Sequence, residues 1–131
     1  MGKAQREKGA RIERKVANLL KPVFGDRTIR SSGQCFSGDT RADVDCPHLW
    51  VECKVGKRPN IKAALEQAEQ AAKSSNSDKK CVAICQWDRE SPTATMRLKD
   101  FIEILSLAYL GGSHGSVGAS IYRQEDGDSG C

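Results

Sequence analysis

Three apolar residues lead directly into an acid, a thiol and a base in the stretch LWVECK, residues 49–54. Side chains of a β-strand alternate between its two faces, so an extended conformation places Glu52 and Lys54 on one face. Val51 and Cys53 then point to the other face, where they can pack on a core. The stretch therefore predicts a strand that presents a carboxylate and an ammonium group side by side.

A second carboxylate comes shortly before this strand. Asp43 lies in RADVDC, residues 41–46, which predicts a neighbouring strand joined to the first by a turn at Pro47 and His48. Carboxylates bind hard divalent cations such as Mg²⁺, and a bound cation activates water and polarises phosphate oxygens. The pattern therefore indicates hydrolysis of a phosphodiester by a metal-dependent enzyme.

The other elements follow from hydrophobic periodicity and from turn residues. Helices are predicted over residues 5–24, 61–75 and 98–110, with Asn60 as the cap of the second. Strands are predicted over residues 27–30, 42–46, 49–54, 80–86 and 93–98. This order predicts an α/β sandwich with a central mixed sheet flanked by helices.

The first predicted helix carries a further acid, Glu13. The apolar face of this helix is formed by Ile12, Val16, Leu19, Leu20 and Val23. At about 100° per residue, Glu13 falls about 20° outside that arc. A carboxylate at the rim of a buried face can lean into a cleft, or it can pair with a nearby Arg or Lys on the surface.

Length and composition indicate one compact domain over residues 1–110, followed by a flexible tail rich in Gly, Ser and acidic residues over residues 111–131. No apolar run approaches the roughly 20 residues of a membrane span, and the start lacks the apolar stretch of a signal peptide. We therefore expect a cytoplasmic protein, in the host cytoplasm if it is phage-encoded. The six cysteines are then expected to be reduced thiols.

The charge is unevenly distributed. The net charge is +4, but the last 20 residues contribute −2, so the remainder carries +6. Its cations cluster at Lys3, Arg6, Lys8, Arg11, Arg14 and Lys15, and again at Lys54, Lys57, Arg58 and Lys62. Such clusters favour a polyanionic partner, although solvated helix faces have a similar composition.

Two motifs together resemble a known family. Gly9-x-Arg11-x-Glu13-Arg14 in the first helix and Asp43-x8-Glu52-Cys53-Lys54 resemble the PD-(D/E)XK nuclease superfamily. The likeness is greatest to archaeal-type Holliday junction resolvases and related small phage-encoded nucleases, and it covers most of residues 8–105. Ala42 stands where the superfamily has its name-giving proline. The resemblance implies a restriction-endonuclease-like α/β sandwich.

The resemblance also implies roles for individual residues. Glu13, Asp43 and Glu52 would be catalytic ligands of Mg²⁺ or Mn²⁺, with the backbone carbonyl of Cys53 as a further metal ligand. Lys54 would be the catalytic cation, acting either as a fixed charge or as a base. Asp45 shares the strand face of Asp43 and is the alternative aspartate.

More peripheral roles complete the prediction. Ser32, in a Ser-Gly loop, and Gln67, in the second helix, resemble residues that approach the substrate in relatives. DNA-binding candidates are Arg6, Lys8, Arg11, Arg30, Lys57 and Arg58. Resolvase relatives are homodimers, and the apolar face of the third helix is a candidate dimer surface: Phe101, Ile102, Leu105, Ala108 and Tyr109.

The sequence therefore predicts a magnesium-dependent DNA endonuclease of DNA recombination, structure-selective and resolvase-like, with branched DNA as its expected substrate. Two alternatives stay open. One is a phage-type endonuclease that nicks or degrades ordinary duplex DNA. The other is a basic DNA-binding module without catalytic activity, whose acidic residues are surface charges.

Overall fold

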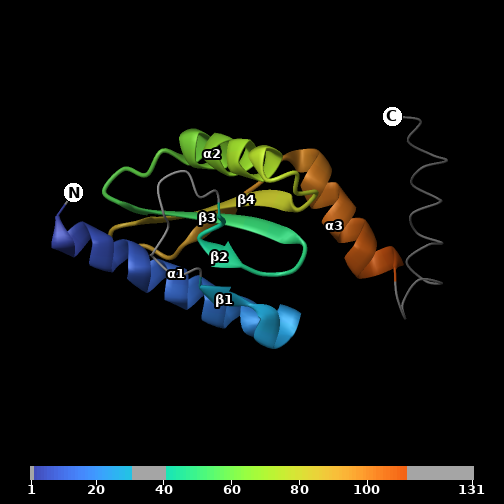
Figure 1. Cartoon of the computed structure of the whole chain (residues 1–131), viewed down its shortest axis with the longest axis horizontal. Coiled ribbons are helices and arrows are strands. Elements are labelled where there is room, and N and C mark those ends of the chain that lie inside the picture. Colours follow the sequence, from blue (N-terminus) through green and yellow to red (C-terminus); the bar gives the residue numbers. More distant parts are fainter. Residues whose placement is uncertain (1, 31–40, 112–131) are drawn as a thin grey trace. The chain divides into compact units, whose positions relative to one another are not determined.

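A five-stranded mixed sheet with a helix on each face forms most of the computed structural model, which describes residues 2–30 and 41–111 (Figure 1). The chain divides into two compact units, residues 1–96 and 97–131, and each is considered by itself. The predicted tail, residues 111–131, lies outside the described residues except for Gly111, and so does the predicted loop residue Ser32.

The first unit holds the whole sheet. Its elements are α1 (Lys3–Phe24), the 3-10 helix η1 (Gly25–Arg27), β1 (Ile29–Arg30), β2 (Val44–Asp45), β3 (Leu49–Gly56), α2 (Ile61–Ser74), β4 (Lys80–Trp87) and β5 (Thr93–Thr95). The spatial order is β1-β2-β3-β4-β5, with β3 and β4 parallel and the other pairs antiparallel. Helix α2 is the crossover that a parallel pair requires. The predicted α/β class with a mixed sheet flanked by helices is confirmed.

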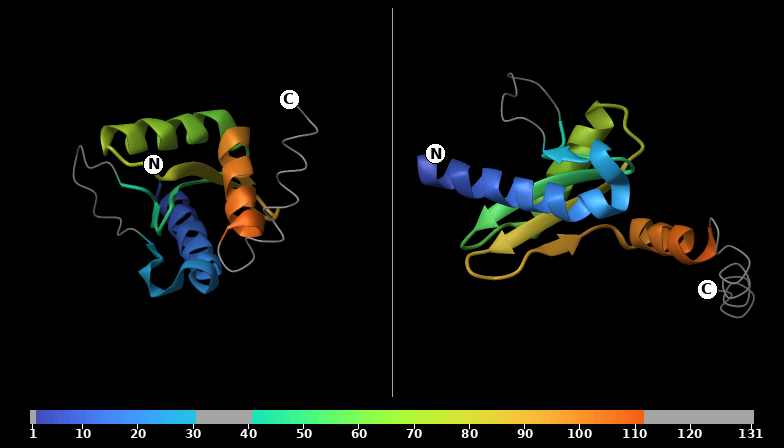
Figure 2. Two further views of the ribbon diagram at one scale, coloured as in Figure 1. Left: turned by 90° about the vertical axis from the view of Figure 1, so that its right-hand side faces the viewer. Right: turned by 90° about the horizontal axis from the view of Figure 1, so that it is seen from below.

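Side chains of β3 alternate between two separate cores. Trp50 packs on the side of α2, against a core that includes Ala68. Val51 and Cys53 pack on the side of α1, in the core that includes Ile12. Helices α1 and α2 therefore cover opposite faces of the sheet, as two further views also show (Figure 2). By the same alternation, Glu52 and Lys54 share the face of Trp50.

Helix α2 meets the sheet through small side chains. Ala64, Ala68 and Ala72 are buried, and they pack in one core with Ala83 and Cys85 of β4. Side chains of this size let a helix lie close to a sheet without overpacking. At its start, the Asn60 side chain accepts a hydrogen bond from the Ala63 N–H (2.9 Å), so the predicted cap is confirmed.

The first two strands are shorter than predicted. Residues 25–27 form a 3-10 turn that leaves only Ile29–Arg30 for β1, and β2 covers two residues in place of 42–46. Strand β2 pairs with β3 only at Val51 and Trp50. Within residues 2–30 and 41–111, the second half of β3 consequently has β4 on one side and no strand on the other.

The buried face of α1 is also rotated from its predicted position. Leu19 and Val23 are exposed, at 61% and 70%, whereas Ala17 is buried and Phe24 packs against the core. At about 100° per residue, an arc from Ile12 through Val16 to Ala17 encloses Glu13. Glu13 is half-buried on this side of the helix.

The second unit contains α3 (Leu98–Leu110), over the predicted range. None of its residues is buried, and several large apolar side chains of the predicted dimer surface are exposed: Phe101, Ile102, Leu105 and Tyr109. A homodimer through this face stays a prediction. Within the described part of the chain, every helix is too short or too polar to cross a membrane.

The close approach of α2 gives a test of the packing. Ala68→Leu should lower the free energy of unfolding by about 1–3 kcal/mol, because the added carbons have no space between α2 and the sheet. The matched change Ala63→Leu, at an exposed position of the same helix, should alter it by less than about 0.5 kcal/mol. Urea denaturation of both variants measures the difference, and equal effects would contradict the packing described.

Candidate active site

The carboxyl groups of Asp43 and Glu52 are hydrogen-bonded to each other beside β3. Glu52 is 4% exposed, and Asp43, which directly precedes β2, is partly exposed. The Asp43 N–H donates to the Val51 carbonyl (2.9 Å), and Asp43 Oδ2 accepts from the Cys53 N–H (2.8 Å). These two bonds hold Asp43 to the residues on either side of Glu52, so the contact between the two acids is fixed by the backbone.

The Cys53 amide shows how this geometry arises. In a longer β2, a carbonyl of that strand would accept the Cys53 N–H, but here the Asp43 carboxylate takes its place. The N–H and C=O of one strand residue point to the same side of the strand, so the Cys53 carbonyl also faces the edge away from β4. That is the edge on which Asp43 lies, as the predicted role of this carbonyl requires.

Glu13 reaches the same region from α1. Its charge raises the pKa of Glu52, and it also raises the pKa of the Cys53 thiol, whose main cause of elevation is burial. Asp43 and Glu52 act on the same thiol. Three predicted acidic residues from separate segments are thus within electrostatic reach of Cys53.

Burial is the largest cause of the raised pKa of Glu52, which moves from the ordinary 4.5 to about 9. The hydrogen bond that protonated Glu52 donates to Asp43 and the charge of Asp43 raise this pKa further, the Lys54 ammonium lowers it, and the charge of Glu13 raises it again. The Glu52 carboxyl therefore keeps its proton at neutral pH and shares it with Asp43.

Lys54 is exposed and follows Glu52 by two residues, so both lie on one face of β3. Its charge lowers the pKa of Glu52, and it opposes the rise that burial causes in the pKa of the Cys85 thiol on β4. Lys54 and Cys85 are partners in the register of these strands. The ammonium group is therefore close to the carboxyl pair and open to solvent.

Two other predicted site residues, Asp45 and Gln67, are exposed to solvent. Asp45 pairs with Lys79 (3.4 Å), and its side chain is 60% exposed. Asp43, not Asp45, is the aspartate in contact with Glu52. Gln67 is exposed on α2, away from the buried face of this helix, which includes Leu65 and Ala68.

The predicted DNA-binding residues fall into two groups. Arg6, Lys57 and Arg58 are exposed. Lys8 and Arg11 line a pocket beside α1 that also contains Lys15 and Arg89. The side chain of Arg30 and all of Ser32 lie outside the described residues.

The carboxylate oxygens at this site are of the type that a hard cation binds, but two carboxylates are fewer than a metal site normally requires. Oxygen ligands from Asp43 and Glu52 are in contact, and the proton between them is what a divalent ion would replace. Within residues 2–30 and 41–111, however, no three His, Cys, Asp or Glu side chains form a group that could hold a metal ion. Two carboxylates are thus in position, and Glu13 is electrostatically near without completing a cage.

Lys15, Asp88 and Arg89 are the site residues that sequence reasoning did not select. Lys15 appears in the sequence only as one of several cations on α1, and residues 88–92 read as a simple turn. Their grouping depends on how α1 crosses the ends of β3 and β4, which no local pattern specifies. Comparison with protein-family models, with curated proteins and with solved structures finds no match to this chain.

The raised pKa of Glu52 makes stability depend on pH. In the metal-free protein, folded Glu52 keeps its proton up to about pH 9, whereas the unfolded chain releases it near 4.5. The contribution of this group to stability is therefore complete below about pH 4.5, falls as the pH rises and is lost above about pH 9. Urea unfolding in EDTA should show the decline in the wild type.

Glu52→Gln supplies the control for this titration, because glutamine does not ionise. The difference in unfolding free energy between variant and wild type should grow steadily in favour of the variant between about pH 5 and pH 8.5. A difference that stays constant across that interval would contradict a proton held on Glu52.

Proposed function

We propose that the chain is a divalent-metal-dependent DNA endonuclease. Asp43, Glu52 and Glu13 are the proposed metal ligands, together with the Cys53 carbonyl, and Lys54 is the cation beside the scissile phosphate. In this proposal the enzyme belongs with the PD-(D/E)XK nucleases and resembles the Holliday junction resolvases. Mg²⁺ is the expected metal, and Mn²⁺ is expected to replace it.

The observation that carries the proposal is the buried contact between Glu52 and Asp43. A carboxyl group that is 4% exposed loses hydration, and a second carboxylate beside it disfavours ionisation further. A structural role would be served better by an apolar side chain of similar size. Strongly perturbed acids of this kind are concentrated at functional sites, where a cation or a proton transfer makes use of them.

Each residue of the proposed site has a separate role in phosphodiester hydrolysis. A bound Mg²⁺ would supply a water of lowered pKa and polarise the phosphate oxygens. Asp43 and Glu52 would hold the ion in place of their shared proton, and the Cys53 amide keeps the Asp43 carboxylate in its orientation. Lys54 offsets the negative charge that accumulates on the phosphate during attack.

The substrate is proposed from charge and from the resemblance. The exposed cations Arg6, Lys57 and Arg58 suit contacts with the phosphate backbone, which set position but read no sequence. A structure-selective, resolvase-like enzyme would cleave a four-way junction faster than a linear duplex of the same sequence. A phage-type nicking enzyme would cleave both alike, so a parallel titration of the two substrates separates these readings.

A second candidate is a basic DNA-binding module without catalytic activity. It is favoured by one observation, the lack of a three-ligand metal group among the described residues. In that case the basic residues would bind DNA, and the carboxyl pair would stay protonated with no cation to receive. The two candidates differ in whether divalent ions produce cleavage.

Glu52→Gln tests the catalytic role with little change in shape. Cleavage in Mg²⁺ should fall by at least about 100-fold, because the substituted amide is a poorer ligand for a hard cation. DNA affinity in EDTA should stay within about twofold, because Glu52 is already uncharged at neutral pH. Gel assays of cleavage and of binding measure the two effects.

The matched control is Glu66→Gln, at an exposed position of α2, which should cleave at the wild-type rate. Cleavage that persists in EDTA, or that survives Glu52→Gln, would overturn the metal-dependent mechanism. If the wild type binds DNA and cleaves no substrate with either metal, the non-catalytic module is the correct function.

Lys54 can be tested for the type of catalysis it provides. Lys54→Met should lower the cleavage rate by about 100-fold, since a preorganised charge at the phosphate is lost. Lys54→Arg separates a fixed charge from a base, because arginine stays protonated in proteins. Substantial activity in Lys54→Arg indicates a fixed charge, and activity as low as in Lys54→Met indicates a base. Single-turnover rates measure both, with Lys73→Met, at an exposed position of α2, as the control.

A further inference from the structure

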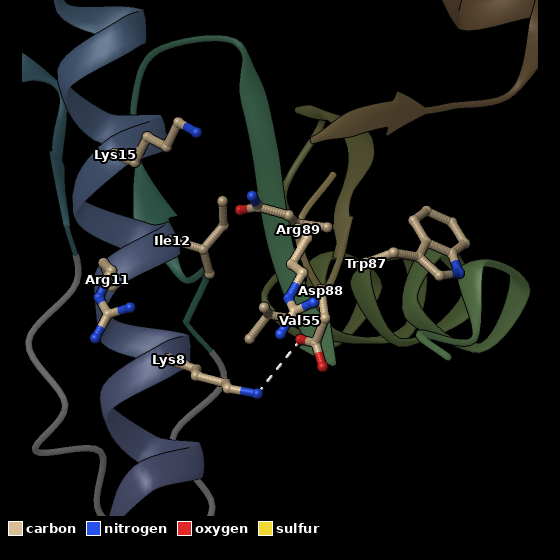
Figure 3. A pocket seen from close by; sticks show the side chains of 9 residues that line it. Lys8, Arg11, Ile12, Lys15, Val55, Trp87, Asp88 and Arg89 are labelled. Carbon is tan, nitrogen blue, oxygen red and sulfur yellow. Dashed lines mark hydrogen bonds and ion pairs between the residues drawn. The ribbon is translucent and has the colours of Figure 1, made fainter. Parts of the chain in front are cut away.

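A basic pocket lies between α1 and the ends of β3 and β4, within the first unit (Figure 3). Its volume is about 440 Å³, and its lining includes four cationic side chains and one acid: Lys8, Arg11, Lys15, Arg89 and Asp88. Val55 and Gln86 contribute to the lining from the two strands. The excess of positive charge, gathered in a concave surface, is suited to a small anionic group.

The pocket stands at the carboxyl ends of two parallel strands. In open α/β sheets, ligands bind preferentially in the crevice outside these ends. The turn after β4 is held there by the Asp88 N–H, which donates to the Gly56 carbonyl at the end of β3 (2.9 Å). Gln5 of α1 donates to the Val55 carbonyl (3.3 Å), so the helix is tied to the same strand end.

Arg89 occupies an unfavourable backbone conformation in that turn. The turn is closed by a hydrogen bond from the Glu90 N–H to the Trp87 carbonyl (3.1 Å), which makes Arg89 its third residue. Arg89 has φ of 66°, and a positive φ at this position strongly favours Gly or Asn. An arginine therefore costs stability here, and such strain is characteristic of sites where the side chain has a function.

The one acid of the pocket moderates its charge. Asp88 Oδ1 lies 3.3 Å from Lys8 Nζ, and these side chains are 32% and 41% exposed (Figure 3). An ion pair this accessible to water contributes little stability, so it can open at small cost. Lys8 can then turn from Asp88 to an incoming anion.

The position of the pocket connects it to the carboxyl pair. Val55 directly follows Lys54 and is three positions from Glu52, roughly 10 Å along β3, with its side chain on the opposite face of the strand.

We propose that this pocket binds one backbone phosphate of the DNA, apart from the phosphate that meets Glu52 and Lys54. Arg89 and Lys15 approach the phosphate from opposite walls, and Lys8 joins them when its pair with Asp88 opens. The ligand class rests on the proposed function. The binding itself does not require that the chain cleave DNA.

Two substitutions with opposite expected effects test the pocket. Arg89→Gly removes the charge and relieves the strained φ, so it should weaken duplex binding by about tenfold while stability is kept or raised. It should also lower the slope of log K against log salt by about 1. Asp88→Asn removes the competing anion, and it should strengthen binding by several fold. Fluorescence anisotropy with the full chain in EDTA measures the affinities.

Controls distinguish the pocket from general charge and from a site for free phosphate. Lys73→Ala removes an exposed cation from α2, and it should change affinity far less than Arg89→Gly. Inorganic phosphate at millimolar concentration should compete weakly with duplex, because only one contact of many is mimicked. Equal DNA affinity in wild type and Arg89→Gly would overturn the proposal, as would tight phosphate binding without an effect on DNA. Loss of cleavage in Glu52→Gln is unaffected by either result, so the two proposals fail separately.

Discussion

Burial of the Glu52 carboxyl against Asp43 constrains the local structure of the sheet more than any other contact. The Asp43 backbone bonds to Val51 and its carboxylate to Cys53, so the β2–β3 ladder begins only after Asp43, where β2 starts. Among the residues that the structure describes, the second half of β3 therefore has a paired strand on one side alone. A buried polar group needs a hydrogen-bond partner. Glu52 has Asp43 as its partner because Asp43 lies outside the short strand β2.

Packing on both faces of β3 fits this requirement. On one face, α2 uses alanines such as Ala68 and lies close to the sheet, which keeps water from Glu52. On the other, Val51 and Cys53 fill the core under α1. The raised pKa of Glu52 is a consequence of this packing, because burial is its largest cause. Loosening α2 would therefore hydrate the carboxyl and bring its pKa back towards 4.5.

Local patterns in the sequence predict the parts of this arrangement that depend on neighbouring residues. Alternation in LWVECK predicts which side chains share a face of β3, and Asn60 predicts where α2 begins; both are confirmed. The predicted apolar face of α1 differs from the observed one because Leu19 and Val23 are apolar but exposed, and periodicity cannot reveal where a sheet stops covering a helix. The contact of Asp88 and Arg89 with the α1 cations has no local signature either, since it joins residues about 80 positions apart.

In the proposed enzyme, a proton and a divalent cation would compete for the carboxyl pair, and bound DNA would favour the cation. At neutral pH the Glu52 carboxyl is protonated, so the metal-free site presents less negative charge to an approaching polyanion than its three acids suggest. A divalent ion must displace that proton, and its apparent affinity therefore rises with pH. A phosphate held at the basic pocket would bring further negative charge near the ion and favour its retention. DNA binding and metal binding would then reinforce each other in the proposed enzyme.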